Sequence, residues 1–176
     1  VICHRVRHRA QRPHQRHHAI NTSHKGVVIS CSVSNYCARM WRNLEMLFAL
    51  RLLTVLSGLG LLVFGLGWWV HPGPAAEVLG ATLLEGTGRT AQIGDTGAFF
   101  VGAGSMLAWG AIRGQPIVLS AGGFLVGLVV PGRVASAIYH GGAWTPDEIV
   151  AECAITLLAV TTASLLYKQR RDTLFR

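Results

Sequence analysis

Three charged residues stand in or beside strongly apolar segments, and they are the side chains best placed to do chemistry. Arg133 lies within the apolar segment 117–139, Glu152 lies early in the next one, and Asp95 opens an earlier one. An arginine in hydrocarbon costs about 2.5–3.5 kcal/mol unless it finds a partner or reaches water. At 1.5 Å per helical residue, Arg133 and Glu152 fall at one depth on two antiparallel helices. The spacing therefore predicts an ion pair between them, with Asp95 close to the same layer.

Several roles stay open for these side chains. The pair could be structural and fix the register of two helices, or Arg133 could snorkel outward to water instead. With Asp95, the pair could also form the polar floor of a pocket whose mouth carries Tyr139 and His140. Asp95 alone would suit the N-cap of its own helix, and Tyr139 and His140 also suit a membrane interface with no further role. The catalytic residues of any enzyme activity are unknown at this stage.

The remaining motifs indicate no cofactor and no metal ion. GTGRTA, residues 86–91, has the G-x-G-x-x-A form, but no strand precedes it and no βαβ unit follows. Cys153 adjoins Glu152 in an apolar run and is expected to be a buried, inert packing thiol. The histidines and Cys3 near the N-terminus have no spacing specific for a metal.

Four apolar segments must position the charged groups. The chain has 176 residues, of which 51% are hydrophobic and 14% charged, whereas an average soluble domain has about 25% charged residues. A span of about 20 apolar residues crosses a bilayer core. We therefore predict an all-α fold, a bundle of four transmembrane helices within residues 45–176. The predicted spans cover about residues 46–70, 95–112, 117–139 and 146–167.

The ends of the spans carry recognisable signals. Arg51 is expected to snorkel to the near interface, and Trp68 and Trp69 to mark the far one. Thr145 and Glu148 have the spacing of a capping box that starts the last helix. A short helix within residues 74–85 is expected to lie on the outer interface.

Two features of the spans concern their shape and packing. Pro131 predicts a kink in the third span, because it removes the amide that would bond the carbonyl of Gly127. Small residues also recur at spacings that let helices approach closely in lipid. These pairs are Gly123 and Gly127, Ala98 and Gly102, and Gly110 and Gly114.

Charge predicts the orientation of the helices. Basic residues flank one side of the four-span arrangement: Arg39, Arg42, Arg51, Arg113, Lys168, Arg170 and Arg171. The opposite loops hold mainly acids: Glu77, Glu85, Asp95, Asp147 and Glu148, against Arg89. The positive-inside rule then places both ends of the bundle in the cytoplasm.

Residues 1–44 differ from the rest of the chain. They contain seven Arg, one Lys and no acid, and they have no sustained apolar period. We predict a disordered basic tail. A start site assigned too far upstream of the true one explains the composition of this segment best. A transit peptide, contact with anionic headgroups or nucleic acid, and metal capture are the alternatives, and no nucleic-acid partner is predicted.

A resemblance adds to this interpretation. The shared features are a polar start and small residues in the second helix, Gly132-Arg133 late in the third, a short glycine loop, and Glu152 early in the fourth. In these features the chain resembles, over about residues 46–167, the small bacterial four-helix membrane proteins catalogued as domain of unknown function 4345, which are broadly DoxX-like. The resemblance implies an integral inner-membrane bundle without an established activity. Arg133 and Glu152 match the family's polar positions.

Three classes of function remain. The leading prediction is a small, multi-pass protein of the bacterial inner membrane that binds a lipid-like ligand, a membrane partner or a second copy of itself. The first alternative is a membrane-embedded enzyme, an isomerase or reductase of an apolar substrate, with Glu152 as acid–base group and Arg133 tuning it. A tight arginine partner opposes the proton exchange that this role needs. The second alternative is a subunit of a transporter.

Overall fold

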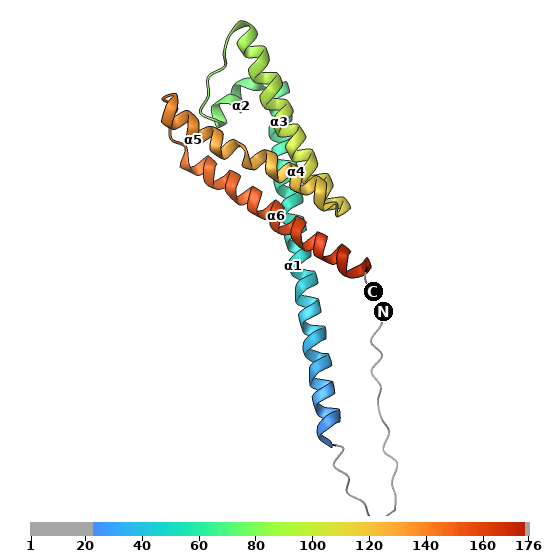
Figure 1. The fold of residues 1–176 in the computed structure, drawn as a ribbon. Coiled ribbons are helices and arrows are strands. Elements are labelled where there is room, and N and C mark those ends of the chain that lie inside the picture. The colour runs from blue at the N-terminus through green and yellow to red at the C-terminus, as the bar shows by residue number, and fades with distance from the viewer. Residues whose placement is uncertain (1–22, 175–176) are drawn as a thin grey trace, which may run out of the picture. The chain divides into compact units, whose positions relative to one another are not determined.

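The structure is a computed structural model that describes residues 23–174, with side chains described from residue 45 onward. The described part of the chain is helical and contains no strand, which confirms the all-α prediction for these residues. The helices are α1 (Ser23–Val70), α2 (Pro72–Val78), α3 (Gly86–Arg113), α4 (Pro116–Gly127), α5 (Val129–Tyr139) and α6 (Pro146–Leu174), as labelled in Figure 1.

The chain divides into two compact units, Val1–Met40 and Trp41–Arg176. In the first unit, the described residues belong to the N-terminal part of α1. The prediction of disorder for residues 1–44 is therefore wrong for residues 23–44, and residues 1–22 lie outside the described part. Extending an existing helix adds one hydrogen bond per residue without a new nucleation step, and no proline interrupts residues 23–44. The second unit contains all the predicted spans.

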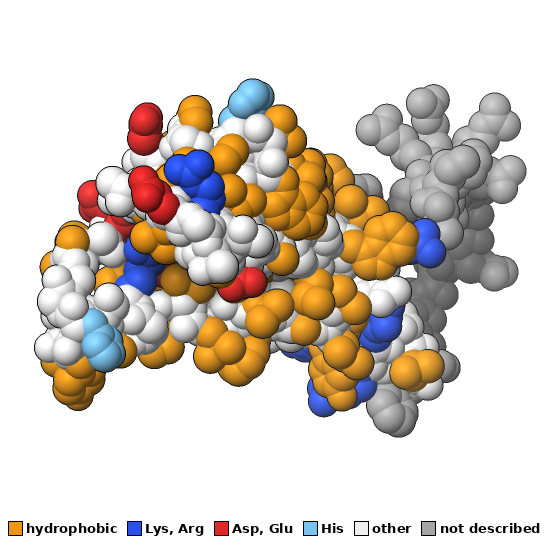
Figure 2. Space-filling view, turned by 90° about the horizontal axis from the view of Figure 1, so that it is seen from above, with side chains coloured by type: hydrophobic (Ala, Val, Ile, Leu, Met, Phe, Trp, Pro, Cys, Tyr) orange, Lys and Arg blue, Asp and Glu red, His pale blue; other side chains and the backbone are white. Residues whose placement is uncertain are grey.

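Three helical stretches are long and apolar enough to cross a membrane. They are Glu45–Val70, Pro116–Tyr139 and Pro146–Leu174, of 26, 24 and 29 residues. They leave large apolar side chains exposed, among them Phe48 (70%), Val63 (65%) and Val150 (67%). Apolar side chains also cover much of the face shown in Figure 2. Apolar surface of this extent is rare on soluble monomers, and it agrees with the prediction of an integral membrane protein.

The predicted second span, 95–112, lies within α3 but does not match the other three. The helix starts at Gly86, well before Asp95, and it is not among the stretches apolar enough to span a membrane in the described chain. Its glycines, alanines and polar residues lower its hydropathy. The same small residues let it pack closely against its neighbours, with Ala103, Leu107 and Ala111 at 0% exposure. Thus α3 buries one face, while Trp109 and Ile112 stay exposed at 54% and 56%.

Glycines hold α1 and α3 in backbone contact. A Cβ added to Gly58 would lie 2.6 Å from the Ala108 nitrogen, and one added to Gly65 would lie 2.7 Å from the Val101 nitrogen. Gly104 of α3 lies equally close to α1, because a Cβ added to it would lie 2.5 Å from the main-chain oxygen of Gly58. This close approach is the packing that small residues permit between membrane helices.

Helix α4 lies between α3 and α6, and its glycines make both contacts possible. A Cβ on Gly123 would lie 2.7 Å from the Ala159 Cβ, and one on Gly127 would lie 3.1 Å from Thr156 Cγ2. Both predicted positions therefore pack against α6. Of the other predicted positions, Gly110 also packs closely, because its Cβ would lie 2.7 Å from the Leu119 nitrogen of α4. A Cβ on Gly102 would meet nothing within 4 Å, and Gly114 is instead the left-handed C-cap of α3, with φ of 60°.

The third span bends where its sequence predicts. Helix α4 ends at Gly127, α5 begins at Val129, and Leu128 is the junction between them. Pro131 lies one turn after Gly127 and has no N–H to offer its carbonyl. The kink is confirmed, and it divides one predicted helix into two.

Two residues at the ends of the first span make contacts that their sequence positions did not predict. Arg51 donates from Nε to the Ala111 oxygen and from Nη2 to the Ile112 oxygen, both at 2.9 Å. It therefore caps the carbonyl end of α3, where a cation is favoured. Trp68 is only 1% exposed and packs with Ala75 of α2, so it belongs to the core and leaves the interface to Trp69.

Residues 79–85 connect α2 to α3. Helix α2 covers Pro72–Val78, less than the expected 74–85, and a left-handed Gly80 (φ 63°) ends its final turn. Gly80 N–H bonds the Glu77 oxygen and Ala81 N–H bonds the Ala76 oxygen, both at 2.9 Å, which is a Schellman motif. Side chains then fasten the connection to α3: Arg89 Nε donates to the Leu84 oxygen at 2.9 Å.

Candidate functional site

The predicted ion pair is present. Arg133 of α5 donates from Nε to Oε1 of Glu152 on α6 at 2.8 Å, and the side chains are 23% and 15% exposed. Two antiparallel helices that lie side by side bring residues at equal depth together, so the equal depth of Arg133 and Glu152 correctly predicts their contact. Helix α6 also approaches α4 one turn further on, where the Thr156 hydroxyl donates to the main-chain oxygen of Glu152 at 2.8 Å and lies 3.3 Å from the main-chain oxygen of Gly123.

The next partner of the guanidinium is Thr145, not Asp95. Arg133 Nη1 donates to the Thr145 hydroxyl at 3.3 Å. No hydrogen bond from Thr145 or Glu148 side chains to the first turn of α6 is present within the described residues, so the predicted capping box does not form. Thr145 instead serves the arginine.

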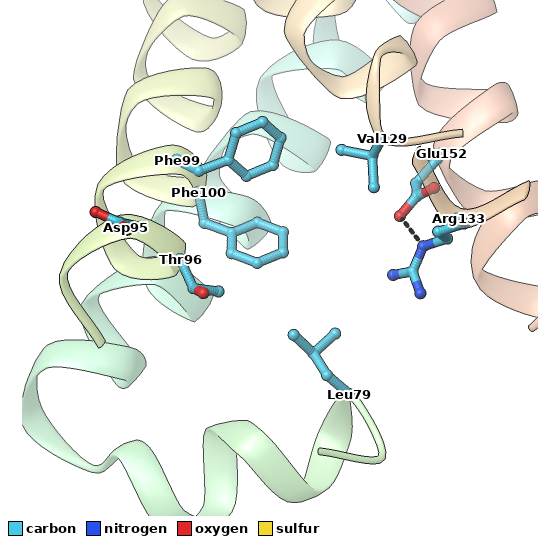
Figure 3. Close-up of a pocket in the computed structure, with 8 residues that line it drawn as sticks. All are labelled: Leu79, Asp95, Thr96, Phe99, Phe100, Val129, Arg133 and Glu152. Atoms are coloured by element: carbon cyan, nitrogen blue, oxygen red, sulfur yellow. Dashed lines mark hydrogen bonds and ion pairs between the residues drawn. The ribbon is translucent and has the colours of Figure 1, made fainter. Parts of the chain in front are cut away.

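Asp95 lies on the far side of the same space. It is exposed and stands inside α3, so it cannot be the N-cap of that helix. Figure 3 shows its carboxylate turned away from Arg133, with the rings of Phe99 and Phe100 lying between. The predicted cluster of three charges is therefore an ion pair with a separate, solvated carboxylate.

These residues nevertheless share one pocket with a cavity volume of 360 Å³. Its lining comes from α3, α5, α6 and the residue that follows α2. The lining residues are Leu79, Asp95, Thr96, Phe99, Phe100, Val129, Arg133 and Glu152. Figure 3 shows two unlike walls, with the ion pair on one side and the aromatic rings on the other. An apolar pocket with a few convergent polar groups is the usual form of a small-molecule site.

Packing fixes the aromatic wall. Phe100 meets Phe64 of α1 edge to face, with ring centroids 4.8 Å apart, and Phe99 in a similar way at 5.2 Å. Phe64 and Phe100 both pack against the cluster formed by Trp68, Ala75 and Ala76. The wall is thus anchored to this buried cluster, and a ligand would meet rings already held in place.

The ion pair leaves hydrogen-bonding capacity unused. A guanidinium has five N–H donors, and the contacts with Glu152 and Thr145 occupy two of them. On the partner side, Glu152 Oε2 is buried and has no hydrogen-bond donor within the described chain. The arginine is therefore the half of the pair that can still offer bonds to a molecule in the pocket.

Two predicted mouth residues do not belong to the pocket. Tyr139 is 77% exposed, His140 is exposed, and neither is among the lining residues. They stand at the end of α5, beyond Arg133, whereas Leu79, which follows α2, does line the pocket. Sequence reasoning missed Leu79, although Gly80 after an apolar helix is the signal of a C-cap that turns the chain back.

Cys153 is exposed, contrary to the prediction of a buried thiol. Consecutive residues of an α-helix point about 100° apart, so the residue after the inward-facing Glu152 faces outward. Within the described residues, no group of three His, Cys, Asp or Glu side chains could hold a metal ion. Cys3 and the histidines up to His18 lie outside those residues.

Comparison with known proteins returns no assignment. The chain matches no protein-family model, no curated protein and no solved structure. The resemblance to the family of domain of unknown function 4345 therefore stays a prediction.

Proposed function

We propose that residues 45–176 form a four-span domain of the bacterial inner membrane, and that the pocket between α3, α5 and α6 binds a lipid-like ligand. Both ends of the domain lie on the cytoplasmic side. The observation that carries the binding proposal is the pocket itself: 360 Å³ of space, aromatic on one wall and charged on the other. Ligand pockets commonly have volumes of about 300–1,000 Å³.

The positions of the basic residues support the orientation. Arg51 bonds the last carbonyls of α3, next to Arg113. A Cβ on Gly114 would lie 3.9 Å from Leu166, which is close to the basic end of α6. The basic groups of three helices therefore gather at one end, and the positive-inside rule assigns that end to the cytoplasm.

The burial of α3 supports its role as the fourth span. A helix needs strong apolarity only where lipid touches it, and α3 turns its fully buried Ala103, Leu107 and Ala111 to neighbouring helices. Small residues at helix interfaces are the means by which membrane helices associate. Thus α3 crosses the bilayer in the company of α1 and α4.

Binding fits the pocket better than catalysis. The arginine engages the Glu152 oxygen that faces the pocket, and general acid–base catalysis would require that oxygen to exchange protons with a substrate. The prediction of an isomerase or reductase therefore ranks second, and a transporter subunit third.

Pocket filling tests the proposal. Val129→Trp places a large side chain in the lining, whereas Val150→Trp adds the same side chain on the exposed face of α6. We expect native mass spectrometry of protein purified in a neutral detergent to show a co-purified amphiphile on the unmodified protein and on Val150→Trp, but not on Val129→Trp. If Val129→Trp retains the same adduct in the same proportion, the ligand lies elsewhere and the proposal is wrong.

A further inference from the structure

We infer that the ligand carries an anionic head group, a carboxylate or a phosphate monoester, and that this head docks on the free edge of the Arg133 guanidinium. The inference rests on the proposed binding function and specifies the chemical class of the ligand. In this pocket an unused charged donor, an apolar wall and a cavity coincide.

The unused donors of Arg133 point into the cavity. Arg133 gives Nε to Glu152 and one Nη1 proton to Thr145, and no hydrogen bond from Nη2 is present in the described part of the chain. Figure 3 shows the terminal nitrogens pointing into the open space toward Leu79. The Nη1 and Nη2 edge of a guanidinium matches the paired oxygens of a carboxylate or phosphate.

The two acids of the pocket offer no matching site for a cation. Glu152 Oε2, the oxygen without a partner, is buried and closed to a molecule in the pocket. Asp95 is exposed and its carboxylate turns away from the cavity, so water screens its charge. A cationic head would find no free acceptor, whereas an anionic head finds three free N–H groups.

The aromatic wall fixes the position of the tail. Phe99 and Phe100 lie across the space from Arg133, with Val129 nearby. A molecule whose head bonds the guanidinium would therefore place its chain against two rings and an aliphatic side chain. The class of ligand is a single-chain acidic amphiphile.

A set of matched probes tests the head group. The protein is placed in nanodiscs of phosphatidylcholine, which carries no net charge. Decanoate, decyl phosphate, decanol and decyltrimethylammonium are titrated by calorimetry, with empty discs subtracting partition into lipid. We expect decanoate and decyl phosphate to bind more tightly than the other two, and their ratio identifies which anion is preferred. Inorganic phosphate alone is expected not to bind, because it has no tail.

Two variants test the role of charge. Arg133→Gln is expected to weaken both anionic probes about tenfold or more, because it removes a charged hydrogen bond, and to leave decanol within about twofold. Asp95→Asn is expected to leave all four decyl compounds within about twofold, because its carboxylate is exposed and turned away from the cavity. The order of the four affinities on the unmodified protein decides the matter if Arg133→Gln fails to fold.

A different order of affinities among the probes would overturn the inference. Tightest binding of decyltrimethylammonium, weakened by Asp95→Asn, would make the head group cationic. Equal affinities for all four decyl compounds would mean that the pocket does not recognise the head group, while the proposed binding function stands. Binding of inorganic phosphate as tight as that of decyl phosphate would refute the role of the tail. Failure of every decyl compound to bind would refute the proposed function together with the inference.

Discussion

The contact between Arg133 and Glu152 can be measured by a double-mutant cycle. Arg133→Met and Glu152→Gln are made singly and together, and unfolding is followed at equilibrium in mixed micelles with increasing dodecyl sulfate. Each single change leaves one partner without its opposite charge. The double change removes both charges, so it should cost less than the sum of the two.

The exposure of the two side chains gives the magnitude. They are 23% and 15% exposed, which places the pair between a surface pair, worth about 0–1 kcal/mol, and a fully buried one, whose disruption costs about 3–5 kcal/mol. We expect each single change to cost about 2–3 kcal/mol. The double variant should recover about 2 kcal/mol relative to the sum of the single changes.

A matched control and a clear negative outcome complete the cycle. Asp147→Asn removes an exposed carboxylate from the first turn of α6 and should change stability by about 0.3–1 kcal/mol, through the helix dipole alone. Additivity of Arg133→Met and Glu152→Gln within about 0.5 kcal/mol would mean that the side chains do not interact. The pair would then have no part in fixing α5 against α6.

Three further experiments test the packing of the unit by the same unfolding measurement. Gly58→Ala should destabilise the protein by about 1–3 kcal/mol, because the new Cβ would meet the α3 backbone at 2.6 Å. The control Gly60→Ala has nothing within 4 Å of its Cβ and should leave stability unchanged or raise it. Equal effects of the two variants would contradict the close approach of α1 and α3. Arg51→Gln should cost about 1–3 kcal/mol through the loss of two bonds to the end of α3, and an unchanged midpoint would show that water replaces the cap. The cycle of Thr54→Val and Thr162→Val should give a coupling below about 1 kcal/mol. The hydroxyls are 3.2 Å apart, but each also bonds its own helix, and two protons cannot serve three contacts; a coupling above about 2 kcal/mol would contradict this.

Depth along the helices was predictable from sequence, and so was the ion pair. Arg133 and Glu152 are close because helix rise is constant and the third and fourth spans are joined by a short connection. Pro131 likewise predicts the break at Leu128, since the missing amide is a local property of the chain. The ion pair and the break at Leu128 depend on one helix or on two helices that follow each other in the chain, so the sequence is enough to predict them.

Contacts that depend on a third helix were not predictable. Trp68 and Arg51 stand at the ends of an apolar run and resemble interface residues, but α2 covers one and the end of α3 receives the other. Asp95 was misplaced because polar residues from Gly86 onward resemble a loop, whereas they form the first turns of α3. The outward position of Cys153 was within reach, because helix geometry alone turns it away from Glu152.

The low apolarity of α3 has a consequence for biogenesis. Segments leave the translocon according to their apolarity, and α3 falls below the level that the other three stretches reach. In the proposed topology, its glycine face finds α1 already in the bilayer, with Gly58 and Gly65 ready to receive it. Insertion of the second span then depends on association of α3 with α1 and not on the apolarity of α3 alone. A variant that lacks α1 should therefore leave α3 outside the membrane.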